Sequence, residues 1–258
     1  MEIKYKSVKN NLNFTIKDQQ INGITGSNTE NIKDIIRVRD SGEGKILADG
    51  KELKDIASYI KEIKVVTERF PENVHNASLF EYMLQEIRHY NIYPKNINKK
   101  IVDSLKIVGL KEELLERNIY SCSTAEKKMI QIAIALLTNP SVIILEEPFN
   151  CLDFKNTKRL VLLFRKMKEQ YHKTIIIISN DPEILYKYTD HLIIYINGKI
   201  LDEGQTDKVY TNVDMLRRHK IKVPELVEFT YKARTNKNIK IDYHKDIRDL
   251  IKDIYKHV

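Results

Sequence analysis

The sequence has few of the residues that hold disulfide-rich domains or metal centres together. It contains only two cysteines, Cys122 and Cys151, which form no C-x-x-C pair, and its seven histidines are scattered without ligand spacing. The cysteine count and spacing give no basis for a disulfide framework. They also argue against a zinc site.

Long apolar runs are missing as well. The aliphatic runs, such as the four isoleucines at 175–178, fall far short of the roughly 18 apolar residues that a membrane-spanning helix requires. No charged and then apolar signal segment opens the chain. With 42% hydrophobic and 31% charged residues, the composition is that of a globular protein. We therefore expect a soluble protein that stays inside the cell, with one large domain or two small ones.

Glycine is scarce. The chain has 8 glycines in 258 residues, near 3%, whereas about 7% is usual. Loops that bind phosphate use glycines because their backbone must come close to the anion. Any such loop in this chain must therefore work with few of the residues that it normally needs.

Positive charge is unevenly distributed. The formal charge is +8, and the segment from residue 205 to the end holds 13 Lys and Arg against 8 Asp and Glu. A basic tail is compatible with an acidic partner or with a solvated helical face. We do not expect a nucleic-acid partner, because the sequence shows no basic surface interleaved with aromatic residues.

The hydrophobic pattern predicts strands that alternate with helices. Alternation at 12–16 is typical of a half-buried strand, and the β-branched runs at 142–145 and 175–178 predict strands buried on both faces of a parallel sheet. Further strands are expected at 21–24 and 192–195, and helices within 79–137 and at 159–168. This order predicts an α/β sheet that is covered by helices.

The end of the chain is polar and helical. Ile247, Leu250, Ile251 and Ile254 follow the spacing of one helix face. We expect this apolar stripe to pack against another surface.

Residues 23–30 resemble a degenerate phosphate-binding loop between a strand and a helix. Such a loop is written G-x-x-x-x-G-K-[ST], in which the Lys contacts phosphate and the hydroxyl holds Mg²⁺. The corresponding residues here are Gly23, Ile24, Thr25, Gly26, Ser27, Asn28, Thr29 and Glu30. Asn28 can adopt the left-handed backbone of the last glycine. Thr29 removes the lysine cation and Glu30 adds a carboxylate, so both changes weaken the binding of a polyphosphate.

Two further segments could carry chemistry. Glu146 and Glu147 follow the strand at 142–145, at the edge where open α/β sheets bind ligands. Adjacent carboxylates there can hold a metal-bound water and polarise an attacking water. Ser123 begins an apolar helix whose first amide groups attract anions. Taken singly, residues 23–30 could also be an ordinary strand-turn-helix, and Ser123 could simply cap a helix.

The order and spacing of these segments resemble those of the ATP-binding cassette (ABC) ATPases over the whole chain. The resemblance implies a P-loop NTPase sheet core. It also implies a cassette domain at 1–206, with a helical subdomain at about 74–140, and a small helical extension at 207–258. Within the family, residues 70–73, 115–117, 223–228 and 231–234 are most similar to the ATPase subunits of energy-coupling factor (ECF) uptake transporters.

The resemblance implies roles for single residues. Glu147 stands at the position of the catalytic base, Asn180 at that of the switch histidine, and Tyr5 near that of an aromatic ring stacked on adenine. Glu30 and Glu146 stand at the magnesium positions. The nucleotide-binding positions are Gly23, Gly26, Ser27, Asn28, Thr29, Glu30, Arg69 and Glu146. The positions of the signature and of the dimer contact are Ser123, Thr124, Ala125, Glu126 and Asp153.

Several of these residues depart from the family pattern. Arg69 replaces a glutamine, and Asn180 cannot take up or pass on a proton at neutral pH. Phosphoryl transfer depends on positioning and on charge neutralisation by Lys and Mg²⁺. Each lost stabiliser typically costs about 10²-fold or more in rate. We therefore expect a site that binds ATP weakly and does not turn it over, with Mg²⁺ binding left open.

The sequence thus predicts the degenerate half of a heterodimer in an ECF-type importer. Its partners would be a second, competent ABC ATPase and a transmembrane transporter subunit, at the inner face of the cell membrane. Three alternatives remain open. The chain could be a regulator or scaffold that keeps the fold, a homodimer, or an active ATPase in which Lys33 or Lys45 reaches into the loop.

Overall fold

The computed structural model describes residues 1–7, 12–37, 44–67, 78–89, 95–237 and 239–257. The strands are β1 Ile3–Ser7, β2 Leu12–Ile16, β3 Ile21–Ser27, β4 Lys45–Ala48, β5 Lys51–Glu52, β6 Ile63–Val66, β7 Val142–Glu146, β8 Thr174–Ile178, β9 His191–Ile196 and β10 Lys199–Gln205. The helices are α1 Thr29–Ile36, α2 Ile56–Lys61, α3 Leu79–His89, α4 Ile97–Val108, α5 Thr124–Thr138, α6 Phe154–Glu169, α7 Pro182–Tyr188, α8 Thr206–Thr211, α9 Val213–Arg218, α10 Glu225–Lys237 and α11 Ile247–His257, with 3₁₀ turns η1 Glu112–Glu116 and η2 Ile119–Ser121.

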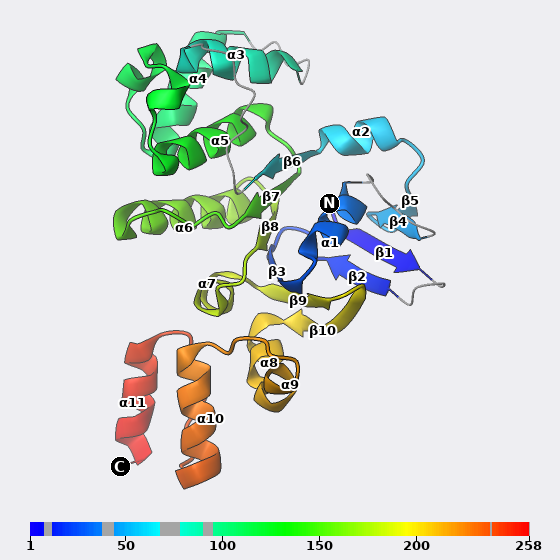
Figure 1. The fold of residues 1–258 in the computed structure, drawn as a ribbon, viewed down its shortest axis with the longest axis vertical. Helices are drawn as coiled ribbons and strands as arrows, with labels where there is room; N and C mark the ends of the chain where they lie inside the picture. The colour runs from blue at the N-terminus through cyan, green and yellow to red at the C-terminus, as the bar shows by residue number, and fades with distance from the viewer. Residues whose placement is uncertain (8–11, 38–43, 68–77, 90–94, 238, 258) are drawn as a thin grey trace.

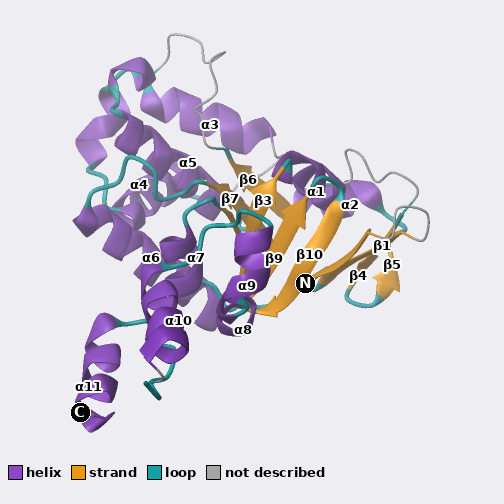
Figure 2. Cartoon of the chain, turned by 60° about the horizontal axis from the view of Figure 1, so that its bottom comes forward, coloured by secondary structure: helices purple, strands orange, loops and turns teal. Residues whose placement is uncertain are grey.

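Two sheets form the centre of the molecule. The larger has six strands in the order β10-β9-β3-β8-β7-β6, and the smaller has four in the order β2-β1-β4-β5. Strands β9, β3, β8, β7 and β6 are parallel to their neighbours, and β10 is antiparallel to β9. Figure 2 shows the small sheet beside the large one, with helices covering the large one. The predicted α/β fold is therefore confirmed.

The β-branched runs are buried because both faces of the large sheet are covered. In β8, Ile175 and Ile177 belong to the core shared with α3 to α7. The alternate residues Ile176 and Ile178 belong to a second core, shared with α1 and the small sheet. Each of the four is at most 9% exposed. A strand without a polar face thus fits only the middle of a sheet that is covered on both faces.

Two groups of helices lie at opposite ends of the molecule (Figure 1). In Figure 1, α3 to α5 form a block at one end of the molecule, and α10 and α11 project at the other. The apolar stripe expected near the end of the chain lies on α11, where Leu250 is 3% exposed but Ile247 and Ile251 are 58% and 45% exposed. Within the described residues, the stripe is therefore only partly covered.

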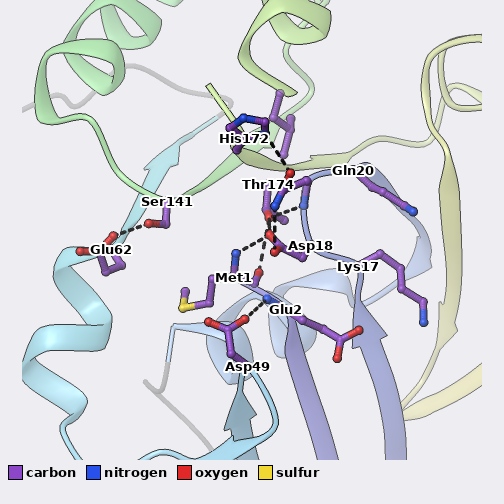
Figure 3. A network of polar contacts seen from close by, with 12 residues as sticks. Met1, Glu2, Lys17, Asp18, Gln20, Asp49, Glu62, Ser141, His172 and Thr174 are labelled. Atoms are coloured by element: carbon purple, nitrogen blue, oxygen red, sulfur yellow. Dashed lines mark hydrogen bonds and ion pairs between the residues drawn. The ribbon is translucent and has the colours of Figure 1, made fainter. Parts of the chain in front are cut away.

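Polar side chains form hydrogen bonds with one another at the edge of the sheet where the parallel strands begin. Asp18, in the turn before β3, accepts a hydrogen bond of 2.9 Å from the Thr174 hydroxyl at the start of β8 (Figure 3). Ser141, just before β7, donates a hydrogen bond of 2.5 Å to Glu62. The residues with predicted chemistry lie at the opposite edge, where these strands end.

Gly26 fixes how closely β3 approaches β9. Its φ is +125°, and a Cβ atom built there would lie 1.9 Å from the carbonyl oxygen of Tyr195. Only a residue without a side chain fits against this backbone.

We predict that Gly26→Ala lowers the free energy of unfolding by at least about 3 kcal/mol, because the methyl group adds a backbone clash to the strain of a positive φ. Gly50→Ala is the control. Gly50 also has a positive φ, of +79°, but a Cβ there meets no atom within 4 Å, so we expect a loss of about 1 kcal/mol. Urea titrations of the two variants give the comparison. Equal losses would show that β3 and β9 can move apart at no cost.

Candidate functional site

A single residue joins β3 to α1. The strand continues to Ser27, and the helix begins at Thr29. Asn28 between them has a left-handed backbone, with φ 57° and ψ 37°. Its side chain does not cap the helix but donates a hydrogen bond of 3.0 Å to Asn197, in the β9–β10 turn.

This connection differs from the phosphate loop expected at 23–30. Gly23 lies in the middle of β3, where a Cβ would come within about 3.1 Å of the Leu192, Leu185 and Thr189 side chains. Pairing with β8 extends to Ile24, and pairing with β9 keeps the strand regular up to its end at Ser27. A phosphate cradle needs several consecutive backbone N–H groups that curve around the anion. One connecting residue is too few for that.

Lys33 occupies the centre of the candidate site. Its ammonium group forms ion pairs with Glu146 and, at 2.5 Å, with Glu30. The Lys33 and Glu146 side chains are only 9% and 14% exposed. Lys45, the other cation considered from the sequence, instead pairs with exposed Glu52 at 3.1 Å.

The strand pattern explains why Lys33 reaches Glu146. Residues on one face of a strand alternate, so Glu146 shares a face with Val142 and Ile144, which belong to the core that α1 covers. In register, Glu146 lies beside Ile178 of β8. The face of the sheet beneath α1 therefore ends in a carboxylate, and a lysine of α1 neutralises it.

The charge of this cluster is balanced internally. Burial by itself would lower the pKa of Lys33, but its hydrogen bonds to Glu146 and Glu30 raise the pKa above the ordinary value. The ammonium group therefore stays charged at neutral pH, between the two carboxylates that stand at the magnesium positions. Among the residues that the structure describes, no group of three or more Asp, Glu, His or Cys side chains is arranged to hold a metal ion.

Glu147 points to the end of β8. Its carboxylate accepts hydrogen bonds of 2.6 Å from the Ser179 hydroxyl and of 2.9 Å from the Asn180 backbone N–H. Its own backbone is in the left-handed region, with φ 40°, and its N–H donates to the Ile178 carbonyl at 2.9 Å. The structure thus brings together the positions predicted for the base and for the switch. Both carboxylate oxygens already have partners.

Asn180 also contacts the end of β3, where the Thr25 hydroxyl donates a hydrogen bond of 3.4 Å to the Asn180 side chain. The predicted site residues on β3, β7 and β8 therefore form one continuous edge. Arg69, together with residues 70–73, lies outside the described residues.

Lys128 is a contributor that the sequence did not single out. It is 4% exposed, and its ammonium group donates to the backbone carbonyls of Thr67 and Glu146, at 2.9 and 3.0 Å. It thereby ties α5 to the ends of β6 and β7. The signal in the sequence was a lysine on the buried side of an apolar helix, but only the fold supplies its two carbonyl partners.

The residues predicted for the signature lie at the start of α5. The Ser123 side chain accepts a hydrogen bond of 3.2 Å from the Glu126 N–H, and the Glu126 carboxylate accepts one of 2.7 Å from the Ser123 N–H. This reciprocal pair is a capping box. Thr124 is exposed and Ala125 half-buried. Asp153 caps α6 in the same way, through a bond of 2.7 Å from the Asn156 N–H, so Ser123 and Asp153 are both exposed helix caps.

Tyr5 is not placed to receive an adenine ring. It is 2% exposed, and its ring is stacked on Phe14 with a centroid distance of 5.5 Å. It belongs to the core between the two sheets, so packing accounts for its presence there.

The chain is similar to known transport ATPases. The family model described as ABC transporter matches residues 9–150. The energy-coupling factor transporter ATP-binding protein EcfA2 of Mycoplasma capricolum is 27% identical over 216 residues, which cover 81% of this chain and 72% of that protein. A putative ABC transporter ATP-binding protein of Pyrococcus furiosus is 28% identical over 233 residues, 87% of this chain and 84% of that protein.

Solved structures show the same fold. The structure of cbiO1 from Clostridium perfringens, described as part of the ABC transporter complex cbiONQ, superposes with a TM-score of 0.69 at 22% identity. The superposition covers 89% of this chain and 98% of that one. In the described part of the chain, none of the helices has the length and apolar character needed to cross a bilayer.

We predict that Lys33→Met lowers the free energy of unfolding by about 3 kcal/mol, because it leaves the Glu146 carboxylate buried without its cation. Lys45→Met, which breaks an exposed pair, should change it by less than about 1 kcal/mol. The double variant Lys33→Met/Glu146→Met should recover most of the loss, because no buried charge is then left unpaired. Chemical denaturation of the three variants measures these differences. A loss for Lys33→Met no larger than that for Lys45→Met would contradict the ion pair.

Proposed function

The chain belongs to the ABC transporter family, and from this premise we propose that it is a cassette subunit of an ECF-type importer whose own site does not hydrolyse ATP. The proposal includes the division into a cassette domain at 1–206 and a helical extension at 207–258. Relatives named as energy-coupling factor transporter ATP-binding proteins support the transporter class.

The position of Lys33 is the observation that supports the inactive site most strongly. Catalysis of phosphoryl transfer needs cations aimed at the phosphate oxygens. Here the lysine ammonium is held by Glu30 and Glu146. A magnesium ion would have to displace it from both carboxylates and also complete an octahedral shell.

The other requirements of Mg²⁺–ATP are also poorly met. The connection between β3 and α1 offers a single residue for a phosphate cradle, and Glu30 would bring a carboxylate near a triphosphate. Glu147 is bonded to Ser179 and Asn180. The residues present therefore do not fit the nucleotide and its metal ion, and we assign no catalytic step to them.

The remaining role in the proposed heterodimer is structural. Ser123 and Asp153 lie exposed at the starts of α5 and α6, where their side chains cap the two helices. In a head-to-tail dimer these ends would complete the nucleotide site of a competent partner cassette. A transmembrane subunit would hold the pair at the inner face of the membrane.

We predict that the purified chain hydrolyses ATP no faster than buffer, and that Glu147→Gln changes neither this rate nor that of the assembled importer by more than about twofold. Ser123→Arg should lower the turnover of the assembled importer by about 10²-fold, the usual cost of losing one transition-state contact. A phosphate-release assay measures both.

Two outcomes would count against the proposal. ATP turnover by the chain alone that disappears in Glu147→Gln would overturn the inactive site. Failure to co-purify with a membrane subunit and a second cassette would favour the alternative of a scaffold or regulator.

A further inference from the structure

A hollow of about 250 Å³ opens at the edge of the sheet where the parallel strands begin, opposite the candidate site. It lies between the last turns of α4, α5 and α6 and the start of β7, and α4 contacts both of the other helices. Apolar side chains from these elements form most of its wall, namely Ile107, Ala135, Leu136, Ile143, Leu163 and Met167. None of the described residues that were assigned to the cassette site lines it.

Buried and exposed apolar residues line this hollow together. Ile143 on β7 and Met167 on α6 are 3% and 4% exposed, whereas Ile107 and Tyr171 are 51% and 58% exposed. A single exposed apolar side chain is ordinary on a protein surface, but these two border a cavity whose inner wall is also apolar. A concave, mostly apolar site with a few polar groups is the usual form of a site for a small molecule.

The polar groups of the hollow include two lysines. Lys173 is half-buried, and its ammonium group donates a hydrogen bond of 3.2 Å to the Asn139 carbonyl at the end of α5. Lys166, in the last turn of α6, lies 5.8 Å from the centre of the Tyr171 ring. In the described part of the chain, no acidic side chain lines the hollow, and neither lysine forms an ion pair.

The Lys173 ammonium group lacks a close counter-ion among the described residues. Burial lowers its pKa, because the charged form loses part of its hydration. The Glu62 carboxylate acts in the opposite direction without cancelling this effect. Glu62 accepts a hydrogen bond from Ser141 and does not line the hollow. An anion bound in the hollow would supply the counter-ion.

The charge balance indicates an anion with a single charge. The C-termini of α5 and α6 adjoin the hollow, and each helix end carries about half a negative charge. Helix α4 also ends here, but it has Lys106 in its own last turn. Two ammonium groups against two helix ends leave about one positive charge. A carboxylate matches this charge and has two acceptor oxygens for the two lysines, whereas a phosphate monoester, with up to about two negative charges, exceeds it.

We propose that this hollow binds a medium-chain fatty-acid carboxylate from solution, with the acyl chain along the apolar wall and the carboxylate between Lys166 and Lys173. The volume lies below the range of about 300–1,000 Å³ that is typical for drug-sized ligands. One short chain therefore fits, whereas the two long chains of a phospholipid do not. The proposal does not depend on the transport role proposed above.

Calorimetric titration of the full chain with octanoate, below its micelle concentration, tests the proposal. We expect saturable binding of one molecule per chain and a melting temperature that rises with octanoate concentration. Hexanoate should bind about 15-fold more weakly, because each of the two missing methylene groups is worth about fourfold. Octan-1-ol has the same chain length but no charge, and should bind at least tenfold more weakly.

Variants separate the two parts of the site. Lys173→Met should weaken the binding of octanoate at least tenfold and leave that of octan-1-ol unchanged, because it removes the charge and keeps an apolar side chain. Lys158→Met is the matched control, since Lys158 is an exposed lysine of α6 that does not line the hollow. It should leave the affinity for octanoate unchanged. Ile107→Glu adds a carboxylate at a half-exposed wall position, and should weaken octanoate binding at least tenfold with little effect on the melting temperature of the free protein.

Three results would overturn the site. They are the absence of saturable octanoate binding, binding of octan-1-ol as tight as that of octanoate, and an octanoate affinity that Lys173→Met and Ile107→Glu leave unchanged. Binding to phosphatidylglycerol vesicles without binding of octanoate would overturn the soluble ligand in favour of a lipid surface. None of these results bears on ATP turnover, so failure of this proposal can be distinguished from failure of the proposed transport role.

Discussion

The ion pairs of Lys33 organise the candidate site. The ammonium group of α1 neutralises Glu146 at the end of β7 and Glu30 in its own first turn. Without this cation the Glu146 carboxylate, which is only 14% exposed, would be left buried without this ion pair, whereas Glu30 is 70% exposed and can be solvated. The lysine therefore supplies from within the chain the positive charge that these carboxylates need.

The short connection before α1 belongs to the same arrangement. Because β3 pairs with β9 as far as Ser27, only Asn28 separates the strand from α1, and Lys33 lies next to Glu146. A longer loop would move α1 along the chain and separate the two groups. The short connection and the internal ion pair are thus parts of one local arrangement.

The polar groups at the carboxyl edge of the sheet are bonded to one another. Glu146 is bonded to Lys33 and Lys128, and Glu147 to Ser179 and Asn180. The charges at this edge are therefore compensated within the chain.

The sequence alone determined those features that depend on neighbours along the chain. Strands β7 and β8 followed from β-branched runs, the fold class from their alternation with helices, and the start of α5 from Ser123. Only the tertiary structure decided that β3 extends through Gly26, that Tyr5 is buried, and that Lys33 meets Glu146, which is 113 residues away. Periodicity and capping are local, whereas the partner of a buried charge depends on strand register and helix packing. These in turn depend on contacts across the whole chain.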